Sequence, residues 1–329
     1  MRKPVSRGGV AVEPGSVGFA SIPAAVLSDG TAVGIPIVIV NGSEDGPTMW
    51  IDAVMHGPEI AGFEVVRMLT REALDPKRLR GAVIAAPMLN PLAFQASRMH
   101  TPQDEYNLNR LFPGAANGLL GQRMADAILH HGVGDAEYLV DLHANPEPAI
   151  AFSLYLAGDT PSHDRAKRMA KAFGVTAIEM RFKHEGHRLG TLSEAAHQLG
   201  KAAIAVELIG WRRILDVSVR IGVRGVLNIL KDVGIISGVI EPQNDTTVIP
   251  GELTRLEVTA DKGGIVDFRC VAGEAVRTNQ VIAVLRNPYG DVVEEIRSPT
   301  DGHILAFPLM HNQAATTGDF VAFIALRAS

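Results

Sequence analysis

Apolar runs and amphipathic stretches alternate along the first 240 residues. Four short runs are mostly apolar and contain β-branched residues, which predicts buried strands. They are residues 48–57, 80–91, 137–148 and 201–210. Between and after them, apolar residues recur at helical spacing. These predicted helices are residues 59–74, 163–174, 191–200 and 220–236. Buried strands that alternate with helices predict an α/β sheet covered on both faces.

Two extended segments precede this alternation. "GFASIPAAVL" and "AVGIPIVIV" flank the turn sequence "SDGT", whose Gly30 suits a positive φ. We therefore expect a pair of strands over residues 17–40.

The pattern changes near residue 240. The polar segment "EPQNDTTVIPGE" indicates a linker, and no helical spacing follows it. Residues 263–285 and 301–324 form two similar units that each open with Gly-bearing sequence and a short apolar strand. A unit this short cannot bury a core alone, so the two halves are expected to interlock. The sequence thus predicts domains over residues 1–245 and 250–329.

Composition and charge narrow the class of protein. The chain has 329 residues, of which 47% are hydrophobic, and a net charge of -5. This gives no electrostatic reason to expect nucleic acid or an acidic membrane as partner. Cys270 is the single cysteine, so an internal disulfide is excluded and a reducing compartment fits. Because we identify no signal segment or membrane span, we expect a cytoplasmic protein; a homo-oligomer is left open.

Unusual polar residues stand at or near the ends of three predicted strands. His56 and Glu59 follow the first, His143 ends the third, and Glu207 lies within the fourth. Ligands of open α/β sheets bind at the carboxyl ends of strands, and imidazole with carboxylate suits zinc. His56, Glu59 and His143 are therefore candidate metal ligands. Glu207 is a candidate base, since a carboxylate in an apolar strand is costly without a partner.

Each of these residues also has an ordinary structural explanation. H-x-x-E arises often by chance, His143 could bond a backbone carbonyl, and Glu207 could belong to a buried ion pair. His184 and His187 suggest a second metal, but a charged loop is the favoured interpretation.

A long polar segment follows the second strand. Residues 89–114 show no periodicity, and loops of this length are often functional. Arg98 and Arg110 are the notable charges in it. A guanidinium can bind a carboxylate or stabilise an oxyanion, although both residues could equally be solvated surface arginines.

Taken in order, H-G-x-E, N-P-x-A-F…R, N-L-N-R-x-F-P-G, D-L-H and "VELIG" resemble the succinylglutamate desuccinylase/aspartoacylase family. The match spans about residues 50–210. The resemblance implies a zinc carboxypeptidase-like fold, with a mixed sheet covered by helices. It also implies that His56, Glu59 and His143 bind one zinc ion per chain, and that Glu207 is the general base.

The same resemblance assigns the loop residues. It implies that Arg98 polarises the scissile carbonyl, and that Asn109 and Arg110 bind the substrate carboxylate. One departure is visible, because Asn107 stands where the family usually has Asp. An Asp there would lie behind the site, so the change puts the tuning of the arginine cluster in question, but not the zinc site.

The C-terminal repeat resembles a biotinyl/lipoyl-type barrel. Carrier domains of that type modify a lysine between the two halves, and this chain has no lysine after Lys262. A swinging-arm carrier is therefore not expected, and a small all-β barrel without covalent cofactor is.

The sequence thus favours a zinc-dependent amidohydrolase acting on a small N-acyl amino acid. A zinc carboxypeptidase acting on peptides and a catalytically inactive binding protein on the same fold are the alternatives. The acyl group and the amino acid are left open.

Overall fold

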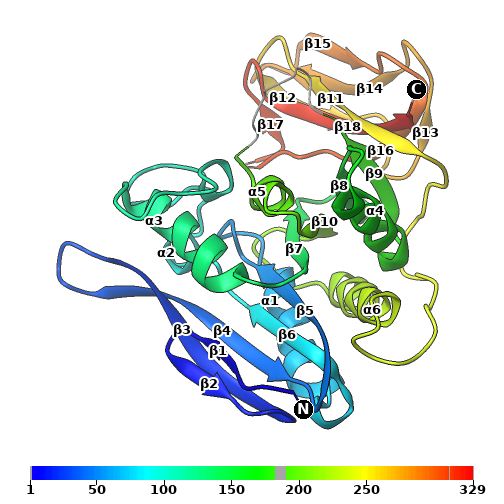
Figure 1. Ribbon diagram of the computed structural model, residues 1–329. Coiled ribbons are helices and arrows are strands. Elements are labelled where there is room, and N and C mark those ends of the chain that lie inside the picture. The colour runs from blue at the N-terminus through cyan, green and yellow to red at the C-terminus, as the bar shows by residue number, and fades with distance from the viewer. Residues whose placement is uncertain (1, 182–189, 311, 329) are drawn as a thin grey trace.

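The computed structural model describes residues 2–181, 190–310 and 312–328. The predicted His184 and His187 loop therefore lies outside the described residues. Three sheets and six α-helices account for most of the described chain (Figure 1).

The strands are, in chain order, β1 (Val5–Arg7), β2 (Val10–Val12), β3 (Ser16–Val26), β4 (Ala32–Asn41), β5 (Glu44–Ala53), β6 (Arg80–Ala86), β7 (Tyr138–Asn145), β8 (Phe152–Leu156), β9 (Thr176–Met180), β10 (Ala202–Ile209), β11 (Leu253–Thr259), β12 (Gly264–Phe268), β13 (Ala275–Val276), β14 (Val281–Arg286), β15 (Val292–Arg297), β16 (Gly302–Ala306), β17 (Ala314–Ala315) and β18 (Phe320–Arg327).

The α-helices are α1 (Ala61–Met68), α2 (Pro91–Ala96), α3 (Leu120–Asp126), α4 (Pro161–Phe173), α5 (Leu192–Gln198) and α6 (Asp216–Asp232). Wider π-type turns extend α1 and α3 at Leu69–Ala73 and Ala127–Val133, and two 3-10 turns lie at Pro76–Arg78 and Leu108–Arg110.

The largest sheet has twelve strands in the order β13-β16-β18-β11-β9-β8-β10-β7-β5-β6-β4-β3. Its centre is parallel, because β10, β7, β5 and β6 run the same way, whereas β8 is antiparallel to β10. The expected mixed sheet covered by helices is confirmed. Figure 1 shows α1, α4 and α6 on one face and α3 and α5 on the other.

Two hydrophobic cores fill the space between this sheet and its helices. One contains Val65, Met169 and Ile229 from α1, α4 and α6. The other contains Trp50 of β5, Met124 of α3 and Ala196 of α5. The central strands are thus apolar on both faces, as the continuous apolar runs predict.

All the predicted strands and helices of the first 240 residues occur. Thr191 caps α5, accepting from the Glu194 backbone N–H at 3.2 Å. The sequence pattern missed β8 and β9, which are short strands of five residues each. It also missed α2, because the polar segment after β6 carries a helix too short to show a period. A helix that ends at His130 and His131 was expected, and α3 with its π-type extension ends there.

The C-terminal region consists of strands throughout its described residues, as predicted. Strands of the two repeats pair with each other, β12 with β17 and β13 with β16, so the halves interlock. They enclose a core that includes Val266, Ile282 and Ile324. Closure of these strands into a biotinyl/lipoyl-type barrel stays a prediction.

The large sheet continues across the predicted domain boundary. β11 pairs in parallel with β9, where Leu253 lies beside Ile178. A separate apolar cluster joins the two regions and includes Phe152, Ile178 and Phe323. The division at residues 245–250 stays a prediction, but the strands on its two sides share backbone hydrogen bonds. No helix in the described ranges has the length and hydrophobicity needed to cross a membrane.

Candidate metal centre

The candidate residues meet at the carboxyl ends of adjacent parallel strands. β5 and β7 align Asp52 with Asp141, and β7 and β10 align His143 with Glu207. Because alternate residues of a strand share a face, Asp141 and His143 point to the same side of the sheet. The order of the strands within the sheet, with β7 between β5 and β10, therefore brings motifs that are distant in the sequence to one place.

A tight turn carries the first two ligands out of β5. Val54 has a φ of 55°, a left-handed conformation that is costly for a β-branched residue. Its carbonyl accepts from the Asn90 N–H at 3.0 Å, which helps to hold the turn. Gly57 follows, and a Cβ there would lie 2.0 Å from the Ala93 carbonyl oxygen. Only glycine fits this approach, so the H-G-x-E spacing presents His56 and Glu59 on one side.

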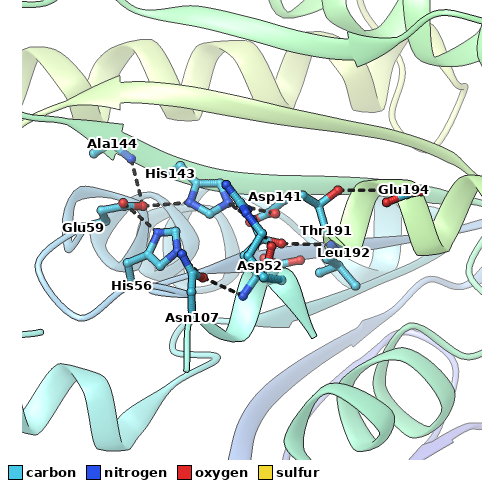
Figure 2. A network of polar contacts seen from close by, with 12 residues as sticks. Asp52, His56, Glu59, Asn107, Asp141, His143, Ala144, Thr191, Leu192 and Glu194 are labelled. Carbon is cyan, nitrogen blue, oxygen red and sulfur yellow. Dashed lines mark hydrogen bonds and ion pairs between the residues drawn. The ribbon is translucent and has the colours of Figure 1, made fainter. Parts of the chain in front are cut away.

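His56, Glu59 and His143 form a compact buried cluster (Figure 2). Each residue offers one ligand atom, and these atoms lie within 4.8 Å of one another. The two Glu59 oxygens lie 2.8 Å from Nδ1 of His56 and 2.8 Å from Nδ1 of His143. The three residues are at most 6% exposed. Two imidazoles and a carboxylate are a donor set typical of catalytic zinc.

The far nitrogen of each imidazole faces an oxygen acceptor. Nε2 of His56 lies 3.1 Å from Oδ1 of Asn107, and Nε2 of His143 lies 2.9 Å from Oδ2 of Asp141. The Asn107 oxygen at Nε2 of His56 favours the tautomer that leaves Nδ1 of His56 free to bind a metal. The donor set and its supporting shell therefore fit a zinc ion held by His56, Glu59 and His143.

Electrostatic interactions in the cluster favour charged groups. Burial opposes the ionised form of Glu59, but the two imidazoles outweigh it and lower the Glu59 pKa to about 2. Burial likewise opposes protonation of His143, but Asp141 and Glu59 outweigh it and raise the His143 pKa well above its ordinary value. The surroundings of Glu59 and His143 thus favour a positive charge between them, as a metal site requires.

Behind His143 lies a pair of buried carboxyl groups. Asp52 is fully buried and accepts from the Trp50 indole N–H at 2.6 Å. Burial, and next the neighbouring Asp141, raise the Asp52 pKa well above its usual range. Asp52 therefore favours its protonated form, beside Asp141, whose Oδ2 faces Nε2 of His143.

Glu207 lies on the strand next to His143 but is not one of the three clustered candidate ligands. Its Oε2 accepts from the Asn145 side-chain amide at 2.9 Å. Burial raises the Glu207 pKa above its ordinary value, although His143 acts in the opposite direction. A carboxyl with a raised pKa, fixed by an amide, is suited to accepting and returning a proton.

The loop after β6 reaches the cluster through two asparagines. Besides facing His56, Asn107 Oδ1 accepts from the Asn109 backbone N–H at 2.9 Å. Asn109 is buried; its Oδ1 accepts from the Leu192 N–H at 2.9 Å, and its Nδ2 lies 3.3 Å from His143 Nε2. The replacement of the family's usual Asp by Asn107 thus bears directly on His56. The sequence had suggested an effect on the arginines; the structure shows the contact with His56 instead.

The two predicted arginines are held more loosely. The Arg98 side chain is 58% exposed and pairs with Glu105 at 3.1 Å. Arg110 donates to its neighbour's carbonyl, at Asn109, over 2.6 Å. Burial, and then the nearby Arg255, lower the Arg110 pKa. The structure therefore brings His56, Glu59, His143, Glu207 and Asn109 together, while Arg98 points to solvent.

Sequence reasoning missed Asp52, Asp141, Asn145 and Arg255 as members of this neighbourhood. The sequence spacing could have predicted two of them. Asp141 stands two residues before His143 and Asn145 two residues after it, so all three share one face of β7. Asp52 and Arg255 become visible only when the pairing of strands is known.

Fold and site together define a class: an α/β protein with a buried two-histidine, one-carboxylate centre at the carboxyl ends of its strands. Residues 45–233 match the succinylglutamate desuccinylase/aspartoacylase catalytic domain. The chain belongs to this family, as its motifs predicted.

Individual relatives agree with this assignment. The chain is 30% identical over 319 residues to the N-alpha-acetyl-L-2,4-diaminobutyric acid deacetylase of Halomonas elongata, covering 94% of this chain and 90% of that one. It is also similar to the crystal structure of a succinylglutamate desuccinylase/aspartoacylase from Rhodobacter sphaeroides, with a TM-score of 0.82, 25% identity and coverage of 95% and 96%. The product-bound ectoine utilization protein EutE (DoeB) from Ruegeria pomeroyi shares the fold, with a TM-score of 0.82, 24% identity and coverage of 94% and 95%.

Proposed function

We propose that this protein is a zinc-dependent amidohydrolase that removes the acyl group from a small N-acyl amino acid. The observation that carries the proposal is the buried cluster of His56, Glu59 and His143 with Glu207 on the adjacent strand. The deacetylase name of the Halomonas relative supports the same chemistry. It makes N-acetyl-L-2,4-diaminobutyrate the first substrate to test.

The bound zinc would lower the pKa of a water and polarise the scissile carbonyl. Glu207 accepts a proton from the attacking water, whose oxygen bonds to the carbonyl carbon. Glu207 then gives that proton to the amide nitrogen as the carbon–nitrogen bond breaks. The products are a carboxylic acid and a free amine. Its raised pKa suits Glu207 to both transfers.

Arg98 is proposed to reach the carbonyl oxygen when substrate binds. It would have to leave Glu105, and an exposed pair of this kind contributes only about 0–1 kcal/mol. Asn109 and Arg110 are proposed to bind the substrate carboxylate next to the scissile amide. Arg110 has spare donors for this role, because a guanidinium carries five N–H groups.

The test combines metal analysis with a substrate panel. Elemental analysis of the purified protein is expected to give one zinc per chain. The panel holds N-acetyl-L-2,4-diaminobutyrate, N-succinyl-L-glutamate, N-acetyl-L-aspartate and short peptides, with amine release as the readout. Hydrolysis of peptides alone would replace the proposal with a carboxypeptidase. Zinc binding without any hydrolysis would indicate an inactive binding protein.

Recognition of the substrate carboxylate can be tested with pairs of substrates that differ only in that group. Replacing it by a carboxamide is expected to lower kcat/KM roughly ten- to hundredfold, because hydrogen bonds between charged groups are lost. Equal turnover of the acid and the amide would show that the substrate is recognised through its side chain instead.

A further inference from the structure

One face of β11 points out of the C-terminal core. Leu256 and Val258 pack against that core, so the alternating residues Arg255 and Glu257 project from the opposite face. Leu253 shares that face and belongs to the apolar cluster that joins the two regions. Phe152, the strand partner of Glu207, lies in the same cluster. Arg255 therefore lies next to the apolar cluster that joins the C-terminal region to the strands of the candidate site.

Arg255 is held in a fixed orientation. Its side chain is 12% exposed, and its Nη2 lies 2.7 Å from Oε1 of Glu257. The guanidinium carbon lies 4.3 Å from the centroid of the Phe323 ring, a cation–π contact. Its Nε is buried and has no hydrogen-bond partner in the described part of the chain. A buried donor without an acceptor is costly, which suggests that something else binds there.

The charge of Arg255 reaches two residues of the candidate site. After burial, it is the largest cause of the lowered pKa of Arg110. It also opposes the rise that burial causes in the pKa of Glu207. The guanidinium from the C-terminal region thus lies within electrostatic range of both the proposed carboxylate binder and the proposed base.

The charges at this place are unbalanced. Arg110 and Arg255 bring two positive charges that repel each other, and Glu257 supplies one negative charge. Both guanidiniums retain N–H groups beyond their contacts with Asn109 and Glu257. An anion placed against both would relieve the repulsion and satisfy the free donors.

We infer that Arg255 is a specificity-determining residue that binds the carboxylate of the N-acyl amino acid together with Arg110. Glu257 and Phe323 position its guanidinium. The inference rests on the proposed function and deepens it, because it gives the C-terminal region a direct part in substrate recognition. A purely structural ion pair at the interface would affect folding but not the preference for a carboxylate.

The experiment compares Arg255→Met and Arg255→Lys with the native enzyme. Substrates are N-acetyl-L-2,4-diaminobutyrate and its carboxamide, and kcat and KM are measured for each. Arg255→Met is expected to raise KM for the acid roughly ten- to hundredfold, with a smaller change in kcat, and to reduce the preference for acid over amide by the same factor. Arg255→Lys keeps the charge and the pairing with Glu257 but loses the two-pronged geometry, so its KM should be intermediate.

Arg269→Met is the matched control. Arg269 also pairs with a carboxylate two residues away, at 2.6 Å, but its partner Asp267 lies on β12 of the four-stranded sheet. This variant should keep native KM, kcat and acid preference. Zinc content and melting temperature, measured for every variant, separate recognition from folding; if Arg255→Met does not fold, Arg255→Lys carries the comparison.

The outcomes separate this inference from the proposed function. If the native enzyme hydrolyses N-acyl amino acids and both Arg255 variants keep its KM and acid preference, the inference is wrong and the proposed function stands. If the native enzyme hydrolyses none of them, the proposed function fails. Calorimetric titration of native and Arg255→Met protein with N-acetyl-L-2,4-diaminobutyrate then decides the inference: binding lost in the variant supports it, and equal or absent binding overturns it.

Discussion

The two sides of the candidate site are held in very different ways. The metal side, His56, Glu59, His143 and Asp141, is buried at the strand ends, and each of its imidazole nitrogens has a partner. The loop side, Arg98 and Arg110, lies on the segment after β6, where the exposed side chain of Arg98 pairs with Glu105. The difference teaches that the strands hold the candidate metal ligands in place before anything binds, whereas the proposed role of the loop side requires Arg98 to leave its present partner.

The strongest test of the metal side removes one ligand. His143→Ala is expected to lose zinc and activity together, because two remaining ligands hold the ion far less tightly. Metal content by elemental analysis and amine release are the measurements. His131→Ala, an exposed histidine, is the control. Full metal occupancy in His143→Ala would remove this residue from the ligand set.

Glu207→Gln distinguishes the loss of proton transfer from the loss of metal. The amide can still bond to Asn145 but cannot carry the proton, so kcat should fall by about 10²–10⁴ with zinc content unchanged. Glu241→Gln, at an exposed ion pair with Lys231, is the control. Near-native turnover of Glu207→Gln would assign the proton transfer to another group.

These first two tests concern residues that the sequence did identify. The convergence of His56, Glu59, His143 and Glu207 was predictable, because parallel strands bring the side chains at their carboxyl ends together; the roles of these residues stay predictions. Asp52 was not, since its role depends on β5 lying beside β7. Arg255 was not, since a sequence does not show which face of β11 meets the catalytic strands. The short β8 and β9 were missed because five residues carry too little pattern.

Low pH should destabilise α5 through protonation of His197. The first residue of this helix, Leu192, donates its backbone N–H to Asn109 of the loop after β6. His197 is buried, its Nε2 lies 3.0 Å from the Ala203 carbonyl oxygen, and its ring stacks on His163. Burial, and then His163, lower the His197 pKa from 6.5 to about 4. Between these values the unfolded chain binds more protons than the folded one, so stability falls as pH drops from about 6.5 to about 4.

The loss from His197 is at most about 3 kcal/mol, from 1.36 kcal/mol per pKa unit. Denaturant unfolding between pH 4 and 7 measures it. His197→Gln retains a donor for Ala203 and cannot titrate, so its stability curve should be flatter over this range. A curve as steep as that of the native protein would mean that other groups cause the acid sensitivity.

Asp141→Asn probes how the metal side is supported. Asparagine keeps an oxygen beside Nε2 of His143 but carries no charge, and loss of such a partner typically costs 10–100-fold in metal affinity or activity. Competition with a zinc chelator measures the affinity. Asp126→Asn, next to His130 on the surface, should leave it unchanged. An unchanged affinity in Asp141→Asn would show that orientation of the imidazole, without charge, is sufficient.

The smallest effect is expected on the loop side. Glu105→Gln frees Arg98 from an exposed pair, so kcat/KM should change less than about fivefold and melting temperature hardly at all. Arg98→Ala in the same assay should be far more damaging if Arg98 polarises the carbonyl. A large effect of Glu105→Gln would mean that the loop side is as preorganised as the metal side.

The pairing of β9 with β11 has a consequence for handling the protein. A chain cut after residue 245 would leave β9 as the edge of the large sheet, with unpaired backbone groups. It would also uncover the apolar side chains of Ile150, Phe152 and Ile178. An open, apolar edge invites other chains to add to it, so such a truncated protein should aggregate on expression. The full chain is therefore the unit to produce and crystallise.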